Sequence, residues 1–364
     1  LQMYRLFNII VLIFFSSQVQ SSSLQIEKVV SGLSIPWGMA FIDNEHLLVS
    51  ERNGHLLVID IKSQEKIKLM DNPTDLYAAG QGGWLDIALS PFERNKVYVT
   101  YSRDTTSGPD TTLAVFEFDS NRAIRFKNLL TTTSFSDTSR HFGSRLAFSD
   151  EHIFMSIGDR GIRENGQSLS THAGSILRLS PDGSPAKNNP FIDKSSLQEE
   201  IYSFGHRNPQ GLFYDKKTRD LWSIEHGPRG GDEINLIKKG ANYGWPITSH
   251  GKEYWGPFDV SELREKEGVE SPKKVYIPSI APSSLMLYRG NNYPELDGKL
   301  LAPALKLMHI NVITISENKQ AIDEHRLFED LKERIRHIIV SPNDELFFST
   351  DQGNIYKILP SQVP

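Results

Sequence analysis

Short runs of alternating apolar and polar residues, separated by polar turns, recur along most of the chain. PWGMAFIDNEHLLVSERNGHLLVID, which begins at Pro36, holds such runs around Asp43-Asn44 and Asn53-Gly54. A period of two is typical of β-strands with one buried face, and Asn, Asp and Gly are the residues that tight turns prefer. Helical periodicity is nearly absent, and only a short helix is expected around residues 328–334. The pattern therefore predicts an all-β protein.

This pattern occurs in six copies along the sequence. The copies begin at Pro36, Gly82, Phe142, Asn208, Pro282 and Arg334. Their spacing, about 50 to 70 residues, is in the range of propeller blades with loop insertions. A single four-stranded blade cannot bury its own faces, whereas a closed ring of blades does so and leaves few exposed edges. We therefore expect one six-bladed β-propeller of four-stranded antiparallel blades over residues 25–360, with a polar insertion at 251–274.

The first residues carry a different signal. Arg5 precedes an apolar run at residues 6–15, and the small polar stretch SSQVQSSS follows. A charged start, a short apolar core and a small-residue tail are typical of a secretory signal peptide, and the run is short for a membrane span. We expect residues 1–23 to be a cleaved signal peptide and the mature chain to be periplasmic or secreted. A retained anchor or a buried strand is the alternative.

Composition narrows the chemistry. The chain has 364 residues, of which 38% are hydrophobic and 23% charged, which is ordinary for a globular protein. Its net charge of −5 gives no reason to expect a nucleic acid or an acidic membrane as partner. The absence of cysteine excludes disulfides, zinc–thiolate sites, iron–sulfur clusters and thiol nucleophiles. No phosphate-binding loop or dinucleotide fingerprint occurs, so a nucleotide cofactor is not expected. No HExxH run of a zinc protease and no G-x-S-x-G elbow of a serine hydrolase occurs either.

One segment mixes residue types that ordinary packing does not require. EHGPRGGDEINLIKKGANYGWP, from Glu225 to Pro246, places five glycines among acidic, basic and aromatic residues. Glycines let backbone carbonyls approach a ligand closely, and Asp232 and Glu233 supply oxygens of the kind that a hard cation prefers. The segment is therefore predicted to be a loop that binds a ligand or an ion.

Other candidate residues lie where blades begin, because a propeller gathers the loops of one face around its axis. His141 leads the third copy of the pattern, and histidine is the usual general base near neutral pH. A hydrogen-bonded structural histidine is the alternative. Gln81 would donate its amide to a ligand carbonyl or, alternatively, cap a turn.

Arginines form the second group of candidates at the blade starts. Arg207 and Asn208 precede Pro209, which favours an extended backbone there. Together they would offer fork-shaped donors to a planar anion, the alternative being an arginine paired with a carboxylate. Arg334 and Arg336 alternate along a predicted strand, so both project to one face. Two neighbouring guanidinium groups repel unless an anion lies between them, and the pair therefore indicates an anion site.

The motifs together resemble the soluble pyrroloquinoline quinone (PQQ)-dependent glucose/sorbosone dehydrogenases, and in particular the compact aldose sugar dehydrogenase branch. The resemblance covers nearly the whole mature chain and rests on seven segments in the family's order. These are GQGGWLDIALSP, HFGSRLAF, SIGDRG, STHAGSILRLSPDG, IYSFGHRNPQG, EHGPRGGDEINLIKKGANYGWP and RIRHIIVSPNDELFF.

The resemblance implies a cofactor, a metal and a reaction. Residues at the cofactor-contacting positions are Gln81, Arg207, Asn208, Lys306, Arg334 and Arg336. Calcium would be bound by the backbone carbonyls of Gly227 and Pro228, and a further calcium by Glu233 with the backbone of Tyr243. His141 would take the proton from the anomeric hydroxyl of an aldose, and hydride would pass to the quinone while Arg207 stabilises the oxyanion. The product would be a lactone, and the electrons would pass to an external acceptor.

Departures from the family pattern limit what transfers. Arg140 precedes the expected base where some relatives have an acidic residue, Ser144 replaces a glycine common in relatives, and His337 replaces a common aspartate. The sugar itself is therefore not predicted; a monomer is expected by analogy. Two alternatives remain open at this stage: a calcium-dependent lactonase-like hydrolase and a non-enzymatic binding propeller.

Overall fold

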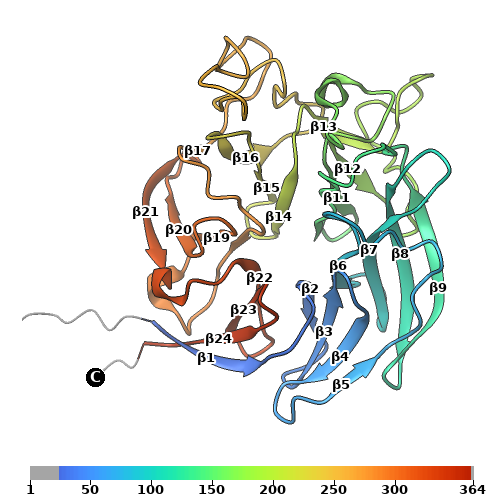
Figure 1. The fold of residues 1–364 in the computed structure, drawn as a ribbon, viewed down its shortest axis with the longest axis vertical. Helices are drawn as coiled ribbons and strands as arrows, with labels where there is room; N and C mark the ends of the chain where they lie inside the picture. Colours follow the sequence, from blue (N-terminus) through green and yellow to red (C-terminus); the bar gives the residue numbers. More distant parts are fainter. Residues whose placement is uncertain (1–23, 362–364) are drawn as a thin grey trace, which may run out of the picture.

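Six four-stranded antiparallel sheets surround a common centre in the computed structural model, which describes residues 24–361 (Figure 1). The predicted all-β, six-bladed propeller is thereby confirmed, and each predicted copy of the pattern corresponds to one blade. The predicted signal peptide lies outside the described residues, so export stays a prediction. Within residues 24–361, no helix is long and apolar enough to cross a membrane.

In each blade the first strand named is the innermost, and each following strand pairs with the one before it. Blade 1 contains β2 (Pro36–Phe41), β3 (His46–Glu51), β4 (Leu56–Asp60) and β5 (Lys66–Lys68). Blade 2 contains β6 (Trp84–Leu89), β7 (Lys96–Arg103), β8 (Asp110–Asp119) and β9 (Arg122–Thr131). Blade 3 contains β10 (Leu146–Phe148), β11 (Ile153–Ile157), β12 (Ser175–Leu179) and β13 (Ile201–Phe204).

The second half of the ring repeats this order. Blade 4 contains β14 (Pro209–Asp215), β15 (Asp220–Glu225), β16 (Asp232–Ile237) and β17 (Lys274–Tyr276). Blade 5 contains β18 (Met286–Leu287), β19 (Leu300–Pro303), β20 (Ile310–Ile315) and β21 (Ala321–Leu327). Blade 6 contains β22 (Ile335–Val340), β23 (Leu346–Thr350), β24 (Ile355–Leu359) and β1 (Gln25–Val30). Three 3₁₀ helices lie between strands: η1 (Arg163–Gln167), η2 (Pro294–Leu296) and η3 (Glu329–Leu331).

The first strand of the described chain closes the ring. β1 pairs antiparallel with β24, with Gln25 opposite Leu359, and so becomes the outermost strand of the last blade. This pairing joins the two ends of the described chain in one sheet (Figure 1), and a buried apolar cluster packs that sheet against blade 1. The ring is therefore held by hydrogen bonds as well as by packing, which removes two strand edges that would otherwise be unpaired.

Alternating residues on each strand fill the spaces between neighbouring blades. On β3, Leu47 and Val49 pack against blade 6, whereas Leu48 packs against blade 2. On β23, Phe348 packs toward blade 5 and Phe347 toward blade 1. Each of the six blade interfaces has such a buried cluster among the described residues. The structure thus corrects the expectation of one buried face, because successive residues of these strands face the two neighbouring blades and both faces are buried.

The channel along the axis has two ends. We call them the strand-start mouth, where the six inner strands begin, and the strand-end mouth, where they finish. Pairing of an inner strand with its neighbour shifts register near the strand-start mouth in β2, β6, β14 and β22. Such bulges leave an extra residue unpaired and turn its side chain; Gln210 and Arg336 are extra residues of this kind.

Arg145 crosses the channel between the two mouths and is only 2% exposed. Its Nη1 lies 2.7 Å from Asp86 Oδ1, its Nε donates to the Gln210 carbonyl and its Nη2 donates to the Ser283 carbonyl, both at 3.0 Å. The guanidinium also lies 4.1 Å from the ring centre of Trp37. One side chain therefore ties together blades 1 to 5 at the axis.

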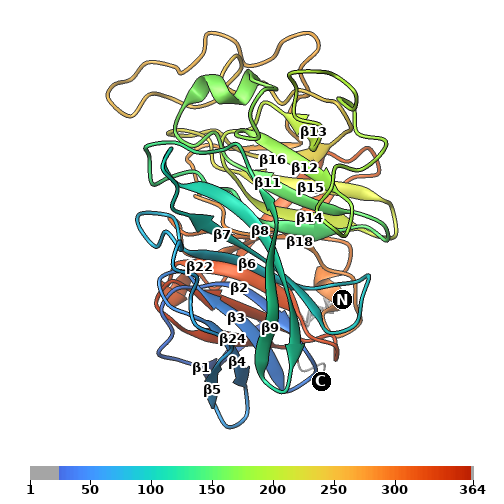
Figure 2. The same cartoon turned by 90° about the vertical axis from the view of Figure 1, so that its right-hand side faces the viewer.

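The predicted insertion at 251–274 lies between β16 and β17 and contains no strand before β17 begins at Lys274, as expected. It projects beyond the blades at one end of the molecule (Figure 2). Arg163 of η1 holds it by two 2.7 Å contacts to the carboxylate of Glu253. The insertion is therefore tied to blade 3 rather than hanging free.

Candidate active site

The predicted site residues gather at the strand-start mouth. His141 precedes β10, Arg207 precedes β14 and Arg334 precedes β22. His141 and Arg207 line one pocket, and Arg207 Nη1 donates to the His226 carbonyl at 3.0 Å. Arg336 Nη1 donates to Gln210 Oε1 at 3.4 Å, so groups from blades 3, 4 and 6 lie close together at this mouth. This is the convergence that the sequence predicted.

His141 is held by a carboxylate that the prediction did not assign. Its Nδ1 lies 2.6 Å from Asp159 Oδ1. Asp159 also accepts from the Gly161 backbone N–H at 2.7 Å and from Trp245 Nε1 at 2.8 Å. A carboxylate that accepts from Nδ1–H fixes the tautomer and leaves Nε2 with a lone pair. His141 thus has the arrangement of an oriented general base.

The protonation of His141 follows from its surroundings. Burial lowers the pKa of its imidazole, Asp159 raises it, and the positive charges of Arg207 and Arg140 lower it again. The net effect is a pKa below the usual value, so the imidazole is neutral near pH 7 and able to accept a proton. Arg140, one of the departures from the family pattern, therefore acts on the pKa of the base.

Glycine is required beside His141. The His141 backbone has a φ of +58°, in the left-handed region, and a Cβ at Gly158 would lie 2.2 Å from the His141 carbonyl oxygen. No other residue type would fit at Gly158 without moving this carbonyl. The close approach of the two backbones helps to orient the imidazole of His141.

Arg207 faces the same pocket as His141. Its Nη1 donates to the carbonyls of His226 and Gly227, each at 3.0 Å, and its guanidinium lies 5.3 Å from the Trp245 ring centre. Arg207, His141 and Pro228 line a pocket of about 300 Å³ together with Asp159, Trp245, Arg140, Arg163, Gly161 and Tyr254. The base and a cation therefore lie side by side in one cavity large enough for a small ligand.

The arginine pair has a carboxylate of its own. Arg334 Nε lies 3.0 Å from Asp351 Oδ2, and Arg336 Nε lies 2.7 Å from Asp351 Oδ1. The anion that the sequence required between them is thus supplied partly by the protein. Arg52 lies nearby: partial burial lowers the pKa of its guanidinium, and the charges of Arg336 and Arg334 lower it as well. Two arginines share one carboxylate with a third close by, and the surplus positive charge suits a ligand with several negative charges.

The remaining cofactor candidates occupy different environments. Gln81 is exposed, and its Oε1 accepts from the His141 backbone N–H at 2.8 Å. Asn208 is buried, and its Oδ1 accepts from the Gly143 N–H at 3.2 Å. Lys306 is exposed and follows Leu305, whose carbonyl accepts from Arg334 at 3.3 Å. Gln81 and Asn208 therefore support the His141 segment, and Lys306 lies beside the arginine pair.

The four predicted metal-binding residues line one small cavity. Gly227, Pro228, Glu233 and Tyr243 surround a space of about 20 Å³, together with Arg207 and Glu225 among others. Burial raises the pKa of the Glu233 carboxyl, and the negative charge of Glu225 adds to the rise. The buried Oδ1 of the adjacent Asn235 has no hydrogen-bond partner within residues 24–361. The buried carboxylate of Glu225 and the partly buried one of Glu233, beside an unpaired oxygen, fit a hard cation, and the space is of the size of one ion or water.

Asp232 has another task. Its Oδ1 accepts from the Gly227 N–H at 2.9 Å and its Oδ2 from the Ala281 N–H at 2.8 Å. The carbonyls of Gly227 and Pro228 each accept one hydrogen bond, from Arg207 and Ser279, and each keeps a second lone pair. Asp232 therefore shapes the loop rather than facing the cavity. Among the described residues, no group of three His, Cys, Asp or Glu side chains has the spacing of a metal site.

Asp159, Trp245, Arg52 and Asp351 are the site residues that sequence reasoning left unassigned. Asp159 lies inside the SIGDRG segment and Trp245 inside the glycine-rich segment, so both were quoted without a role. Arg52 and Asp351 carried no sequence signal. Asp351 reaches the arginine pair only once β22 and β23 have paired, and Arg52 joins them from blade 1.

Known proteins share this architecture. The glucose/sorbosone dehydrogenase family matches residues 33–357. The aldose sugar dehydrogenase of Escherichia coli is 32% identical over 350 residues, covering 93% of this chain and 94% of that protein. A crystal structure of the soluble aldose sugar dehydrogenase of Escherichia coli in the apo-form has a TM-score of 0.89 at 31% identity and covers 93% and 100% of the two chains. The PQQ-bound form of the aldose sugar dehydrogenase of Streptomyces coelicolor has a TM-score of 0.76 at 26% identity and covers 93% and 98%.

Proposed function

Because this chain belongs to the glucose/sorbosone dehydrogenase family, we propose that it oxidises the anomeric hydroxyl of an aldose to a lactone with PQQ and calcium. The observation that carries the proposal is the pocket at the strand-start mouth, where a neutral histidine oriented by Asp159 lies beside Arg207. The surplus cations Arg334 and Arg336 nearby suit a polycarboxylate cofactor.

The residues present fit both groups. Arg207, Asn208, Gln81, Lys306, Arg334 and Arg336 would hold the quinone, the carbonyls of Gly227 and Pro228 would hold calcium next to it, and Glu233 with Tyr243 would hold a further calcium. When bound, the quinone supplies a hydride acceptor and calcium polarises it as a Lewis acid.

The chain's own residues perform the proton chemistry. His141 Nε2 accepts the proton of the sugar hydroxyl, and Asp159 stabilises the imidazolium that forms, because its carboxylate already accepts the hydrogen bond from Nδ1. Arg207 places positive charge at the side of the pocket where negative charge develops. Trp245 and Tyr254 line the pocket and exclude part of the water around the reacting hydroxyl.

The direct test is reconstitution. We expect the purified chain, supplied with PQQ and calcium, to bleach an artificial electron-acceptor dye when aldoses are added, and to stop when either PQQ or the sugar is left out. Product analysis would find the lactone. A folded protein that gives no PQQ-dependent reduction across a panel of aldoses would support the binding propeller instead. Lactone hydrolysis without PQQ would support the hydrolase.

Replacing Asp159 with asparagine should move the acidic limb of the pH profile. Activity requires neutral His141, so it falls as pH drops through the pKa of that imidazole. Asp159 raises this pKa, and Asp159→Asn therefore lowers it and shifts the limb of kcat/KM to lower pH. Turnover at the optimum should fall by about 10- to 100-fold, part of the roughly 10²–10⁴-fold that a positioned base supplies.

The measurement is kcat/KM against pH for both proteins, with the reconstituted enzyme. A limb that stays in place or moves to higher pH would contradict the assignment of Asp159 as the partner of the base. Glu200→Gln is the matched control, because that carboxylate pairs with the buried His172 at 3.0 Å, on blade 3 but outside the pocket. It should leave the limb where it is.

A further inference from the structure

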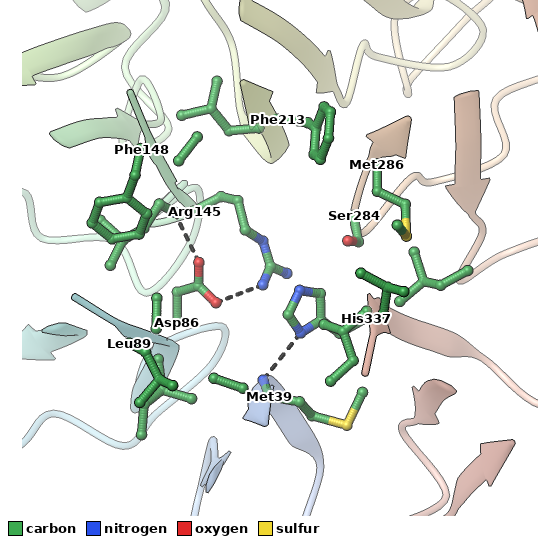
Figure 3. Close-up of a pocket in the computed structure, with 18 of the residues that line it drawn as sticks. Met39, Asp86, Leu89, Arg145, Phe148, Phe213, Ser284, Met286 and His337 are labelled. Carbon is green, nitrogen blue, oxygen red and sulfur yellow. Dashed lines mark hydrogen bonds and ion pairs between the residues drawn. The ribbon is translucent and has the colours of Figure 1, made fainter. Parts of the chain in front are cut away.

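A second cavity lies at the strand-end mouth, across Arg145 from the pocket of His141. Its volume is about 560 Å³. We call it the axial bowl. Each blade contributes one of the side chains that define it: Met39, Leu89, Phe148, Phe213, Met286 and His337 (Figure 3). Because Arg145 and its partners fill the channel between the two cavities, the axial bowl is separate from the proposed active site.

Apolar side chains make up most of the wall of the axial bowl. The charged groups in its lining are Asp86, Arg145 and Lys216. Asp86 and Arg145 pair with each other at 2.7 Å, so their charges cancel. A site of several hundred Å³ with an apolar wall and few polar groups is the usual form of a small-molecule site.

His337 presents a free donor to the axial bowl. It is 8% exposed. Its Nδ1 accepts from the Met39 backbone N–H at 3.0 Å, so the neutral ring carries its hydrogen on Nε2. Burial holds the pKa of this imidazole well below the usual value, and the positive charge of Arg145 adds to the effect. No group within residues 24–361 makes a hydrogen bond to Nε2. Figure 3 shows the ring between Met39 and Arg145, inside the circle of lining side chains.

Ser284 is a second polar group without a partner. It is 1% exposed, and no hydrogen bond of its hydroxyl occurs within the described residues. In Figure 3 the hydroxyl points toward the space between Arg145 and His337. A donor that faces a cavity without a protein partner is satisfied by water or by a ligand, because an unpaired polar group costs free energy.

We propose that the axial bowl binds an uncharged, largely apolar molecule whose carbonyl oxygen accepts hydrogen bonds from His337 Nε2–H and the Ser284 hydroxyl. A carbonyl oxygen has two lone pairs and so satisfies both donors. Asp86 and Arg145 pair with each other, and the exposed Lys216 pairs with Asp150 at 3.5 Å. An ionised carboxylate would therefore lose its hydration without gaining an unpaired counter-charge. Aromatic and alicyclic ketones are the class that this arrangement selects.

The test uses the full chain loaded with PQQ and calcium and three naphthalene probes of similar size. One carries a neutral ketone, one a carboxylate, and one an alkyl group in place of either. Probe fluorescence measures the binding. We expect the ketone to bind saturably with a dissociation constant of about 1–100 µM. It should bind about 3- to 10-fold more tightly than the alkyl probe, the contribution of a net hydrogen bond, and the carboxylate more weakly than both.

Variants locate the site. In His337→Asn the amide oxygen replaces Nδ1 as acceptor for the Met39 N–H while the Nε2 donor is lost, so the preference for ketone over alkyl probe should shrink. Ser284→Ala should reduce the same preference without enlarging any side chain. Leu89→Lys, at a partly exposed wall residue, should weaken both probes, whereas Leu263→Lys, at an exposed leucine of the insertion, should change neither.

Three results would overturn the proposal. They are no saturable ketone binding, ketone binding unaffected by Leu89→Lys, and a ketone preference that survives both His337→Asn and Ser284→Ala. The readout is probe binding, so it does not depend on whether the protein oxidises sugars.

Discussion

Substituting alanine for His141 is expected to lower turnover by about 10²–10⁴-fold, the usual contribution of a positioned general base. The variant should still fold, because Asp159 keeps the hydrogen bonds from the Gly161 N–H and Trp245 Nε1 and is not left without partners. It should also still bind PQQ, since the arginines at the mouth are untouched. Dye reduction with saturating aldose measures the first quantity, and PQQ-dependent quenching of tryptophan fluorescence the second.

His46→Ala is the matched control for this experiment. The partly exposed His46 has the same contact, Nδ1 to the Asp43 carboxylate at 2.9 Å, but begins β3, away from the pocket. Its removal should leave turnover and PQQ binding unchanged. If His141→Ala lost less than about tenfold in turnover, a small part of what a general base supplies, His141 would not be the base. If it lost PQQ binding as well, His141 would be a cofactor contact instead.

Replacing Arg145 with methionine is expected to lower the free energy of unfolding by about 3–5 kcal/mol, the usual cost of removing one partner of a buried ion pair. The methionine fills similar volume, but Asp86 loses its counter-charge and the carbonyls of Gln210 and Ser283 lose their donors. The effect should be large because Arg145 joins five blades at the axis. Guanidinium chloride denaturation followed by tryptophan fluorescence measures it.

Two comparisons separate charge from volume. Asp86→Asn with Arg145→Met removes both charges, so the double variant should be more stable than the sum of the single losses predicts. Arg125→Met removes an exposed arginine that pairs with Glu117 and should leave the unfolding midpoint unchanged. A loss below about 1 kcal/mol for Arg145→Met, the size expected of a surface pair, would mean that the axial cross-link does not stabilise the ring.

The blade repeat could be predicted from the sequence because each blade is a local structure. Hairpin turns such as Asp43-Asn44 and alternating runs such as Leu47 to Val49 lie within a few residues of one another. The period of the apolar residues specifies which faces are buried before any partner is known. The location of the candidate site residues could be predicted for a related reason, because a ring places the first residues of all six blades at one mouth of the channel.

Side-chain partners on neighbouring strands could not be predicted in this way. The sequence indicated an anion between Arg334 and Arg336, but Asp351, which provides it, follows the next strand of the blade and carried no signal of its own. Arg336 is the extra residue of a bulge in β22, and the bulge sets the direction of its side chain. In a strand without a bulge, the alternation of side chains would have directed it differently. Bulges depend on the neighbouring strand, which the sequence does not name.

The amino-acid sequence by itself determined the propeller, its six blades, the insertion, and the presence of His141, Arg207 and the arginine pair near blade starts. Only the tertiary structure decided that Asp159 orients His141, that Arg145 divides the channel, and that His337 faces a cavity at the opposite mouth. The physical reason is distance along the chain. Periodicity and turn chemistry act between near neighbours, whereas a buried ion pair or an unpartnered donor exists only once distant blades have closed around it.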